Sequence, residues 1–283
     1  MLLSLLGVGV ILFLYVALDT AKSNKKQGVT APSSEADHAD HFSINELISN
    51  GKASLSDGQR LSIANLENGI SNATTSLQKV TGLRTLADYW KDSTRQPLLY
   101  AHYTSEAAKL DNSEKSLTFA AQLMLAVVNM ERDTHVKAWA TREAIVLFEK
   151  AIQINPNNDD LRVGLGSCYI LGADGSGDPQ QTMKGIQELL TVVRKDSNNM
   201  DAQFMLGVGG IVSGQYDKAI FRLRKVVDQD PKNIQASLRL ADAYSGLGKK
   251  DSALVWLKHT KSVTKDTAFQ RELEENIKTL SGN

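Results

Sequence analysis

The sequence is poor in cysteine, proline and aromatic residues, and it carries no net charge. Its 283 residues include one cysteine, five prolines and 6% aromatic residues. The single cysteine, Cys168, excludes an internal disulfide framework and a cysteine-clustered zinc site. Because the formal net charge is zero at pH 7, the overall basic character of a nucleic-acid-binding protein is absent, and we expect no nucleic-acid partner. Apolar residues make up 42% of the chain, enough for a core, and with so few aromatic residues they favour a helical protein over a sandwich or barrel.

One long apolar run begins the chain. Residues Leu2 to Leu18 carry no charge, and a helix of this length rises roughly 25 Å, the short end of a membrane span. A cleaved signal peptide is the weaker alternative because the run lacks a charged n-region and a small-x-small cleavage site. The sequence therefore predicts a single-pass membrane anchor over residues 1–21, in a bacterial inner membrane if the resemblance described below holds.

The side of the membrane stays open. Lys22, Lys25 and Lys26 follow the run, so the positive-inside rule places the body of the protein in the cytoplasm. A basic patch upstream of the first residue would reverse this expectation. Residues 22–41 read as a flexible tether; His38 and His41 have no third ligand at suitable spacing, so we expect a solvated linker and no metal.

Helical patterns without a fixed period occupy residues 42–111. Ser43 and Glu46 have capping-box spacing, and Asp57 is a candidate cap for a helix that continues to Leu77 and breaks at Gly82. Pro97 is expected to begin another helix. The region is either a set of degenerate repeats or a helical cap for the elements that follow.

One sequence pattern recurs between Thr141 and Lys265. A small residue is followed by a large apolar residue four positions later and by a break in the helical pattern twelve positions later. The small residues are separated by 41, 34 and 34 positions, and they are Ala144, Gly185, Ala219 and Ala253. A fixed period of this size predicts a stacked array of helical hairpins.

A partner helix precedes each of the last three copies of the pattern, in units that start at Asp159, Met200 and Ile234. In each unit position 7 is apolar, position 8 is small, and position 11 is either aromatic or small. We expect the small residues at positions 8 and 20 to let the two helices of a hairpin approach closely. The large residue at position 24 is expected to fill the gap between neighbouring hairpins.

These residues resemble the tetratricopeptide repeat, a 34-residue pair of antiparallel helices. The likeness is most specific over Met200–Lys232 and Ile234–Lys265, although Gly210 replaces an aromatic residue and Ser197 and Lys265 replace a proline. The resemblance implies an all-α fold: a right-handed α-solenoid of helical hairpins, with an N-terminal transmembrane helix and a C-terminal capping helix. The expected array spans residues 112–266, in units 112–158, 159–199, 200–233 and 234–266, and the capping helix spans 267–283.

The resemblance also implies where a partner would bind. In this family the first helix of each unit lines the concave face, mainly through positions 2, 5, 9 and 12. The candidate protein-binding residues are Asp160, Val163, Ser167, Asp201, Phe204, Val208, Ile211, Gln235, Leu238 and Asp242. Phe204, Val208 and Ile211 form an apolar strip, which either receives an apolar segment of another protein or is filled internally by other helices.

Other site chemistry finds little support. An EF-hand loop opening at Asp174 would need an acid where Gly185 stands, and the glycines Gly164, Gly166 and Gly207 lie in helices and not in phosphate loops. The histidines show no spacing of a catalytic site, and a buried apolar role suits Cys168 better than that of a nucleophile. We expect no catalytic residue, cofactor or metal.

The layout is similar to that of membrane-anchored bacterial tetratricopeptide proteins, many of which face the periplasm. It predicts a non-catalytic scaffold that recruits an unidentified protein or peptide, in the assembly of an envelope complex such as the cytochrome c maturation machinery. The alternative is an oligomeric structural component that uses the repeats for self-association.

Overall fold

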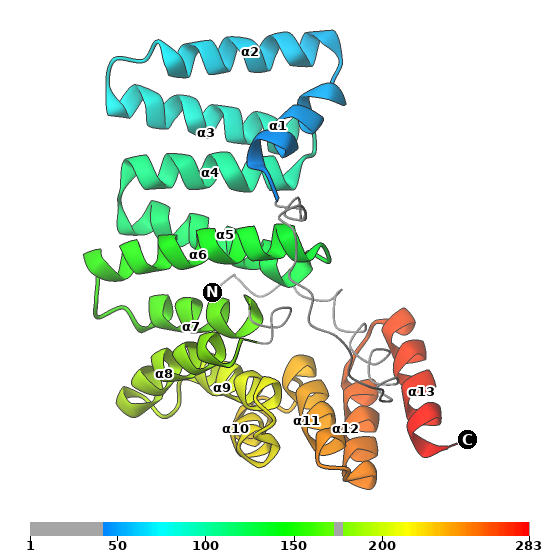
Figure 1. Ribbon diagram of the computed structural model, residues 1–283. Helices are drawn as coiled ribbons and strands as arrows, with labels where there is room; N and C mark the ends of the chain where they lie inside the picture. Colours follow the sequence, from blue (N-terminus) through cyan, green and yellow to red (C-terminus); the bar gives the residue numbers. More distant parts are fainter. Residues whose placement is uncertain (1–41, 173–177, 283) are drawn as a thin grey trace, which may run out of the picture.

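The computed structural model describes residues 42–172 and 178–282. Within these ranges every regular element is an α-helix (Figure 1). In chain order the helices are α1 (Ile44–Ala53), α2 (Asp57–Ser71), α3 (Ser76–Asp92), α4 (Pro97–Asp111), α5 (Glu114–Met130), α6 (Thr134–Ile154), α7 (Asp159–Gly172), α8 (Pro179–Lys195), α9 (Met200–Val212), α10 (Tyr216–Gln229), α11 (Ile234–Gly246), α12 (Lys250–Val263) and α13 (Thr267–Ser281).

The helices pack as consecutive hairpins. The closest pairs are α3 with α4, α5 with α6, α7 with α8, α9 with α10, and α11 with α12. Each hairpin also contacts the next one through its second helix, so the hairpins form one continuous stack (Figure 1). The predicted all-helical array of hairpins is therefore confirmed.

Small residues set the distance between the helices of a hairpin. A Cβ atom placed on Gly185 of α8 would lie 2.6 Å from the carbonyl oxygen of Gly166 on α7. In the next hairpin, a Cβ on Gly210 would lie 3.0 Å from the Cβ of Ala219. The expectation that small residues permit close approach within a hairpin is confirmed. Between α7 and α8 the approach is limited by contact of one backbone with the other.

The large residue at position 24 has two roles where we expected one. Leu189 and Leu223 cover the glycine of their own hairpin, with Leu223 2.5 Å from a Cβ placed on Gly207. Phe148 of α6, by contrast, reaches Gly164 of the next hairpin, where a Cβ would lie 2.3 Å from its ring. Filling of the gap between hairpins is thus seen for Phe148, whereas the two leucines lie within a hairpin.

The turns between hairpins repeat one arrangement. Asn199 and Asn233 cap α9 and α11, and each side chain accepts a hydrogen bond from a backbone N–H three residues later, at 2.9 Å. Asp196 and Asp230 accept backbone hydrogen bonds in the preceding turns, at 2.9 and 3.0 Å. The turn survives the replacement of proline by Ser197 because these side chains hold it.

The sequence misplaced one break near the N-terminus. α2 ends at Ser71 and α3 begins at Ser76, so Gly82 lies inside α3, and the predicted break at Gly82 is wrong. Thr75 forms a capping box with Gln78, which starts the new helix. Gly82 packs against Ile70, because a Cβ there would lie 2.6 Å from the Ile70 side chain. Ser56, rather than the expected Asp57, caps α2.

The stacking changes between α4 and α5. From α5 onward, the first helices of successive hairpins contact one another: α5 with α7, α7 with α9, and α9 with α11. At the earlier junction α4 instead contacts both α5 and α6. The hairpin of α3 and α4 therefore joins the stack in a different orientation from those that follow.

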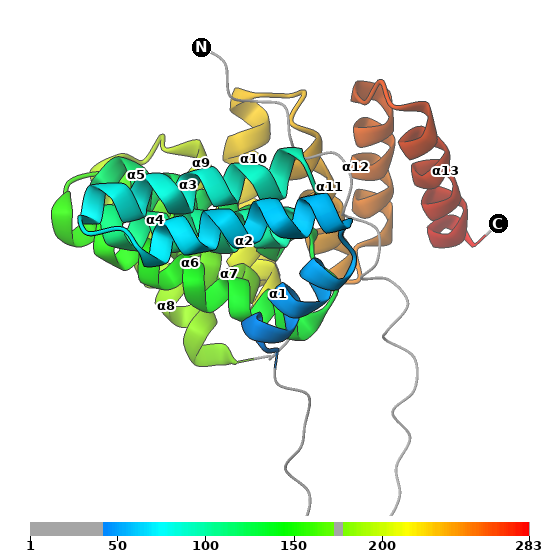
Figure 2. The ribbon, with the colours of Figure 1, turned by 90° about the horizontal axis from the view of Figure 1, so that it is seen from above.

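The array curves from α5 to α13. Successive first helices touch, whereas the described parts of the second helices α6, α8, α10 and α12 make no comparable contact with one another. The first helices therefore lie on the inner side of the curve and the second helices on the outer side. Figure 2 shows the result: α12 and α13 stand to one side of the stack formed by α2 to α6.

α13 closes the C-terminal end. Leu273 is fully buried and Ile277 nearly so, packed with Leu238, Ala241 and Leu257 of the last hairpin. In residues 42–172 and 178–282, none of the helices is long and apolar enough to cross a membrane. The predicted span Leu2–Leu18 and tether lie outside the described residues, as does most of the glycine-rich insertion between α7 and α8.

We predict that Gly185→Ala destabilises the fold, because its new methyl group meets the backbone of Gly166, which yields less readily than a side chain. The expected loss is about 1–3 kcal/mol in the free energy of unfolding, measured by urea titration with circular dichroism. Gly69→Ala is the matched control: no atom lies within 4 Å of its Cβ position, and it is expected to stabilise α2 by about 0.5–1 kcal/mol. Equal effects of the two substitutions would contradict the close-approach account.

Candidate protein-binding surface

The candidate surface is the inner face, which we define as the sides of α5, α7, α9 and α11 that point to the inner side of the curve. Each of the four helices has a polar or acidic residue in its first turn and carries its buried residues in one repeating pattern. The positions between the buried ones are therefore presented in register from one hairpin to the next. This places the predicted residues of α7, α9 and α11 in three parallel rows.

The predicted residues differ in how much of them can reach a partner. Asp160, Asp201 and Gln235, in the first turns of their helices, are exposed. Four are half-buried: Val163, Phe204, Ile211 and Asp242. Ser167, Val208 and Leu238 are buried, at 5%, 5% and 6% exposure, so their side chains serve mainly the packing of the stack.

The predicted apolar strip on α9 is partly filled by the array itself. Val208 belongs to a cluster with Ile170 and Leu189, and Phe204 packs against this cluster and against the next one. Ile211 packs against the cluster centred on α10. Phe204 and Ile211 therefore leave only part of the strip exposed, since Val208 is buried.

Phe119 on α5 adds an apolar residue that the repeat pattern did not predict. Four buried residues of α5 lie 44 positions before their counterparts on α7, namely Leu117, Ala120, Ala121 and Met124 before Leu161, Gly164, Leu165 and Cys168. By the same offset Phe119 is the counterpart of Val163, and it is 52% exposed. Phe119, Val163 and Phe204 thus form a row of apolar residues on three successive first helices, which we call the apolar row.

Charged groups flank the apolar row. Arg162 pairs with Glu188 at 2.8 Å and Arg239 pairs with Asp242 at 3.2 Å. Burial raises the pKa of Asp242, and this effect exceeds the opposing influence of Arg239. Asp160 and Asp201, by contrast, form no ion pair within the described part of the chain. The inner face therefore offers an apolar centre with exposed carboxylates at one edge.

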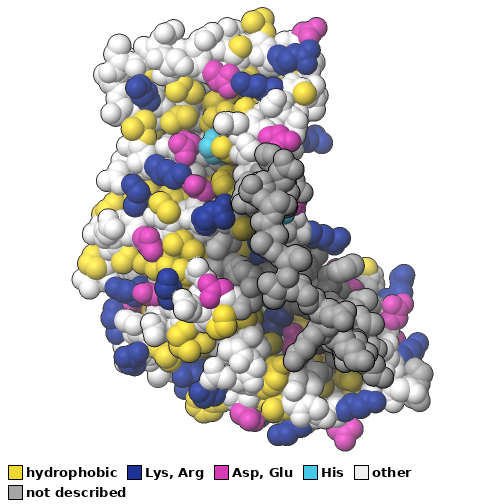
Figure 3. All heavy atoms as spheres, viewed as in Figure 1, with side chains coloured by type: hydrophobic (Ala, Val, Ile, Leu, Met, Phe, Trp, Pro, Cys, Tyr) yellow, Lys and Arg dark blue, Asp and Glu magenta, His cyan; other side chains and the backbone are white. Residues whose placement is uncertain are grey.

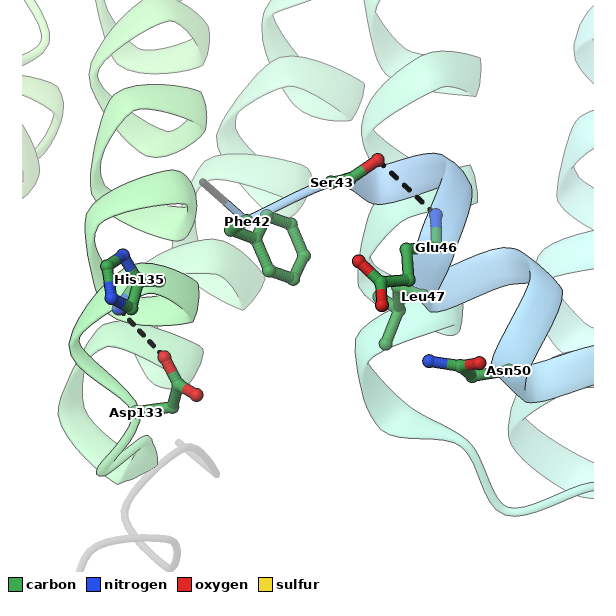
Figure 4. Close-up of a pocket in the computed structure, with 7 residues that line it drawn as sticks. All are labelled: Phe42, Ser43, Glu46, Leu47, Asn50, Asp133 and His135. Atoms are coloured by element: carbon green, nitrogen blue, oxygen red, sulfur yellow. Dashed lines mark hydrogen bonds between the residues drawn. The ribbon is translucent and has the colours of Figure 1, made fainter. Parts of the chain in front are cut away.

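A second hollow lies between the start of α1 and the start of α6 (Figure 4). It is a cavity of about 220 Å³ that contains the carboxyl groups of Glu46 and Asp133 beside His135. Asp133 already caps α6, because its side chain accepts hydrogen bonds from the backbone N–H groups of His135 and Val136. These bonds hold the pKa of Asp133 below its usual range, so its carboxylate serves the helix start.

Metal-ligating residues do not cluster in the part of the chain that the structure describes. No group of three or more His, Cys, Asp or Glu residues there is arranged to hold a metal ion. Cys168 is fully buried, and burial raises the pKa of its thiol well above the usual range, so the reactive thiolate is disfavoured. Burial also lowers the pKa of His102, which packs between Tyr103 and Trp139.

Comparison with known proteins agrees with this arrangement. A family model described as tetratricopeptide repeat matches residues 212–271, the end of α9 through the start of α13. This match identifies tetratricopeptide repeats in residues 212–271, and the hairpins from α5 to α12 stack in the same manner. No protein among those with curated descriptions matches the chain.

Two solved structures, TTC0263 and PilW, share the fold at low sequence identity. TTC0263, a thermophilic tetratricopeptide-repeat protein of Thermus thermophilus, has 12% identity and a TM-score of 0.53 over 72% of this chain and 100% of its own. PilW, described as a widely conserved type IV pilus biogenesis factor, has 17% identity and a TM-score of 0.52 over 72% of this chain and 86% of its own. MamA has 19% identity and a TM-score of 0.47 over 67% of this chain and 93% of its own.

We predict that Asp242→Asn raises stability at neutral pH. Because the pKa of Asp242 is higher in the folded protein than in the unfolded chain, the neutral form favours folding and this contribution is lost as pH rises through the folded pKa. The variant keeps the neutral form at every pH. Its advantage in urea midpoint over the wild type should therefore shrink as the solution is acidified below that pKa. Asp201→Asn, at an exposed position on α9, is the control, and an advantage of Asp242→Asn that is independent of pH would contradict the assignment.

Proposed function

We propose that the protein is a non-catalytic scaffold that binds a segment of another protein on its inner face. The observation that carries the proposal is the apolar row, in which Phe119 leaves half of a large aromatic side chain exposed beside Val163 and Phe204. A free aromatic side chain costs solvation energy, and aromatic anchors contribute strongly to protein interfaces.

The residues of the inner face indicate which side chains a partner would carry. Apolar side chains spaced along a helix or an extended segment would contact the apolar row. Basic side chains of the same segment would lie near Asp160 and Asp201, which have no cation of their own in the described ranges. The partner is therefore a protein segment with apolar residues and a positive charge next to them.

The membrane setting is part of the same proposal. The apolar run Leu2–Leu18 would anchor the chain as a single-pass protein, and residues 22–41 would hold the array close to the bilayer. PilW, which shares the fold, is described as a pilus biogenesis factor, and this supports a role in assembling an envelope complex. Cytochrome c maturation is one such assembly, and a periplasmic array suits it.

Self-association is the second candidate. It rests on the same exposed residue, because Phe119 of one chain could equally bind a second copy of the array. The two functions differ in the identity of the protein that covers Phe119, and one experiment separates them.

A photoreactive phenylalanine analogue at position 119 should cross-link to protein when the full chain is irradiated in its native membranes. The analogue at Val146, on the outer side of α6 and 41% exposed, is the matched control and should give little product. An adduct with a different protein supports the scaffold. An adduct between tagged and untagged copies of the chain supports self-association. The absence of any adduct at position 119, or equal yields at both positions, would refute binding on the inner face.

A further inference from the structure

The outer face of α10 combines an exposed aromatic ring with cations that form no ion pair in the described part of the chain. Ala219, Leu223 and Val226 are buried against the neighbouring helices, and Phe221 lies on the opposite side with 59% of its surface exposed. Lys225 and Arg222 lie over its ring at 5.2 and 5.7 Å from the ring centroid. The ring is thus exposed with Lys225 beside it, whereas the Arg222 guanidinium donates a hydrogen bond to the buried Gln203.

Four cations of α10 lack a carboxylate partner in the described part of the chain. Lys218 and Arg222 contact the amide oxygens of Gln215 and Gln203. Lys225 lies over the ring of Phe221, and Arg224 lies over the ring of Trp256, at 5.6 Å. Elsewhere many cations sit within 4 Å of an acid, among them Lys52, Arg84, Lys109, Arg162, Lys195, Arg239 and Lys261. α10 carries these four cations and two acids, Asp217 and Asp228, so it has an excess of positive charge in a chain with zero net charge.

The neighbouring second helices extend this pattern. Val255 is 62% exposed on the outer side of α12, two positions after its small residue, as Phe221 is on α10. Met183 is 48% exposed on α8, next to Lys184. Figure 3 shows Lys and Arg side chains along the edge that α8 and α10 form. The acids on these faces, Asp217, Asp228 and Asp251, are fewer than the cations.

We call Lys218, Phe221, Arg224, Lys225 and Val255 the α10 patch. We propose that the α10 patch binds the surface of an anionic lipid bilayer. Cations around exposed apolar side chains are the pattern by which proteins contact an interface: the cations bind lipid phosphates and the apolar groups enter the headgroup boundary.

A lipid surface suits the α10 patch better than an acidic protein does. The patch lies on the outer side of the array, where successive second helices diverge. It therefore presents a convex surface and not a groove. A convex surface places few side chains against a rigid partner, but mobile lipid headgroups can gather around each cation. Contact with the bilayer through this convex surface would leave the inner face pointing away from the bilayer and open to a protein. The proposal goes beyond the inner-face function, and either can fail without the other.

The test places a fluorophore that senses polarity at the centre of the α10 patch. Phe221→Cys in the full chain is labelled with a nitrobenzoxadiazole maleimide; Cys168 is fully buried, which directs the label to the new thiol. Val146→Cys on α6 is the matched control, since it also lies two positions after the small residue of its helix. The labelled proteins are mixed with vesicles of phosphatidylcholine alone or of equimolar phosphatidylcholine and phosphatidylglycerol.

We expect a blue shift and a gain of emission at position 221 with the anionic vesicles only, and reversal in concentrated salt. Lys218→Glu with Lys225→Glu should weaken this vesicle response at least about tenfold while circular dichroism stays unchanged. The apolar run Leu2–Leu18 is the same in all variants, so insertion by that run alone would give equal signals with both lipids.

No response at position 221, an equal response with neutral vesicles, or an equal response at position 146 would overturn the proposal. A response to soluble polyglutamate without a response to anionic vesicles would assign the patch to an acidic protein, and would overturn it as well.

Discussion

The close approach of paired helices is the constraint on which the rest of the structure depends. Where Gly185 faces the carbonyl of Gly166, and Gly210 faces Ala219, two helices touch with almost no side chain between them. Large residues such as Leu189 and Leu223 then cover the contact from one side. No hairpin buries its remaining apolar face alone, so each one stacks on the next, until α13 covers the last with Leu273 and Ile277. Contact between successive first helices bends the stack and creates the inner and outer faces.

The sequence predicted the architecture because the same small residues recur at fixed steps. It predicted the break between α2 and α3 wrongly, because Asn72 to Thr75 contain no glycine or proline, and because Gly82 is small for packing against Ile70 and not for a turn. Phe119 was missed because α5 and α6 have 17 and 21 residues, longer than the 13 and 14 of α9 and α10, so the repeat step is lost there. Val208 and Leu238 are buried by residues of neighbouring helices. The sequence pattern of a single helix does not predict such contacts.

The two faces of the curve differ in chemistry, and the difference organises the proposed function. The inner face has the apolar row and the free carboxylates of Asp160 and Asp201. The outer face has Phe221 beside cations that form no ion pair within the described residues. A scaffold that bound lipid with one side and protein with the other would hold its partner at a fixed orientation to the membrane. Within the described residues, polar contacts such as those of Asp133 and Arg222 serve helix starts and hairpin contacts.

The central claim is that another protein covers the inner face, and hydroxyl-radical footprinting measures this directly at the side chain. The full chain is oxidised once in its native membranes and once after purification in detergent, and modification is read residue by residue. The account predicts that Phe119 and Phe204 react less in native membranes than after purification, while Val146 on the outer side of α6 reacts equally in both. Equal reactivity of Phe119 in the two preparations would contradict the claim.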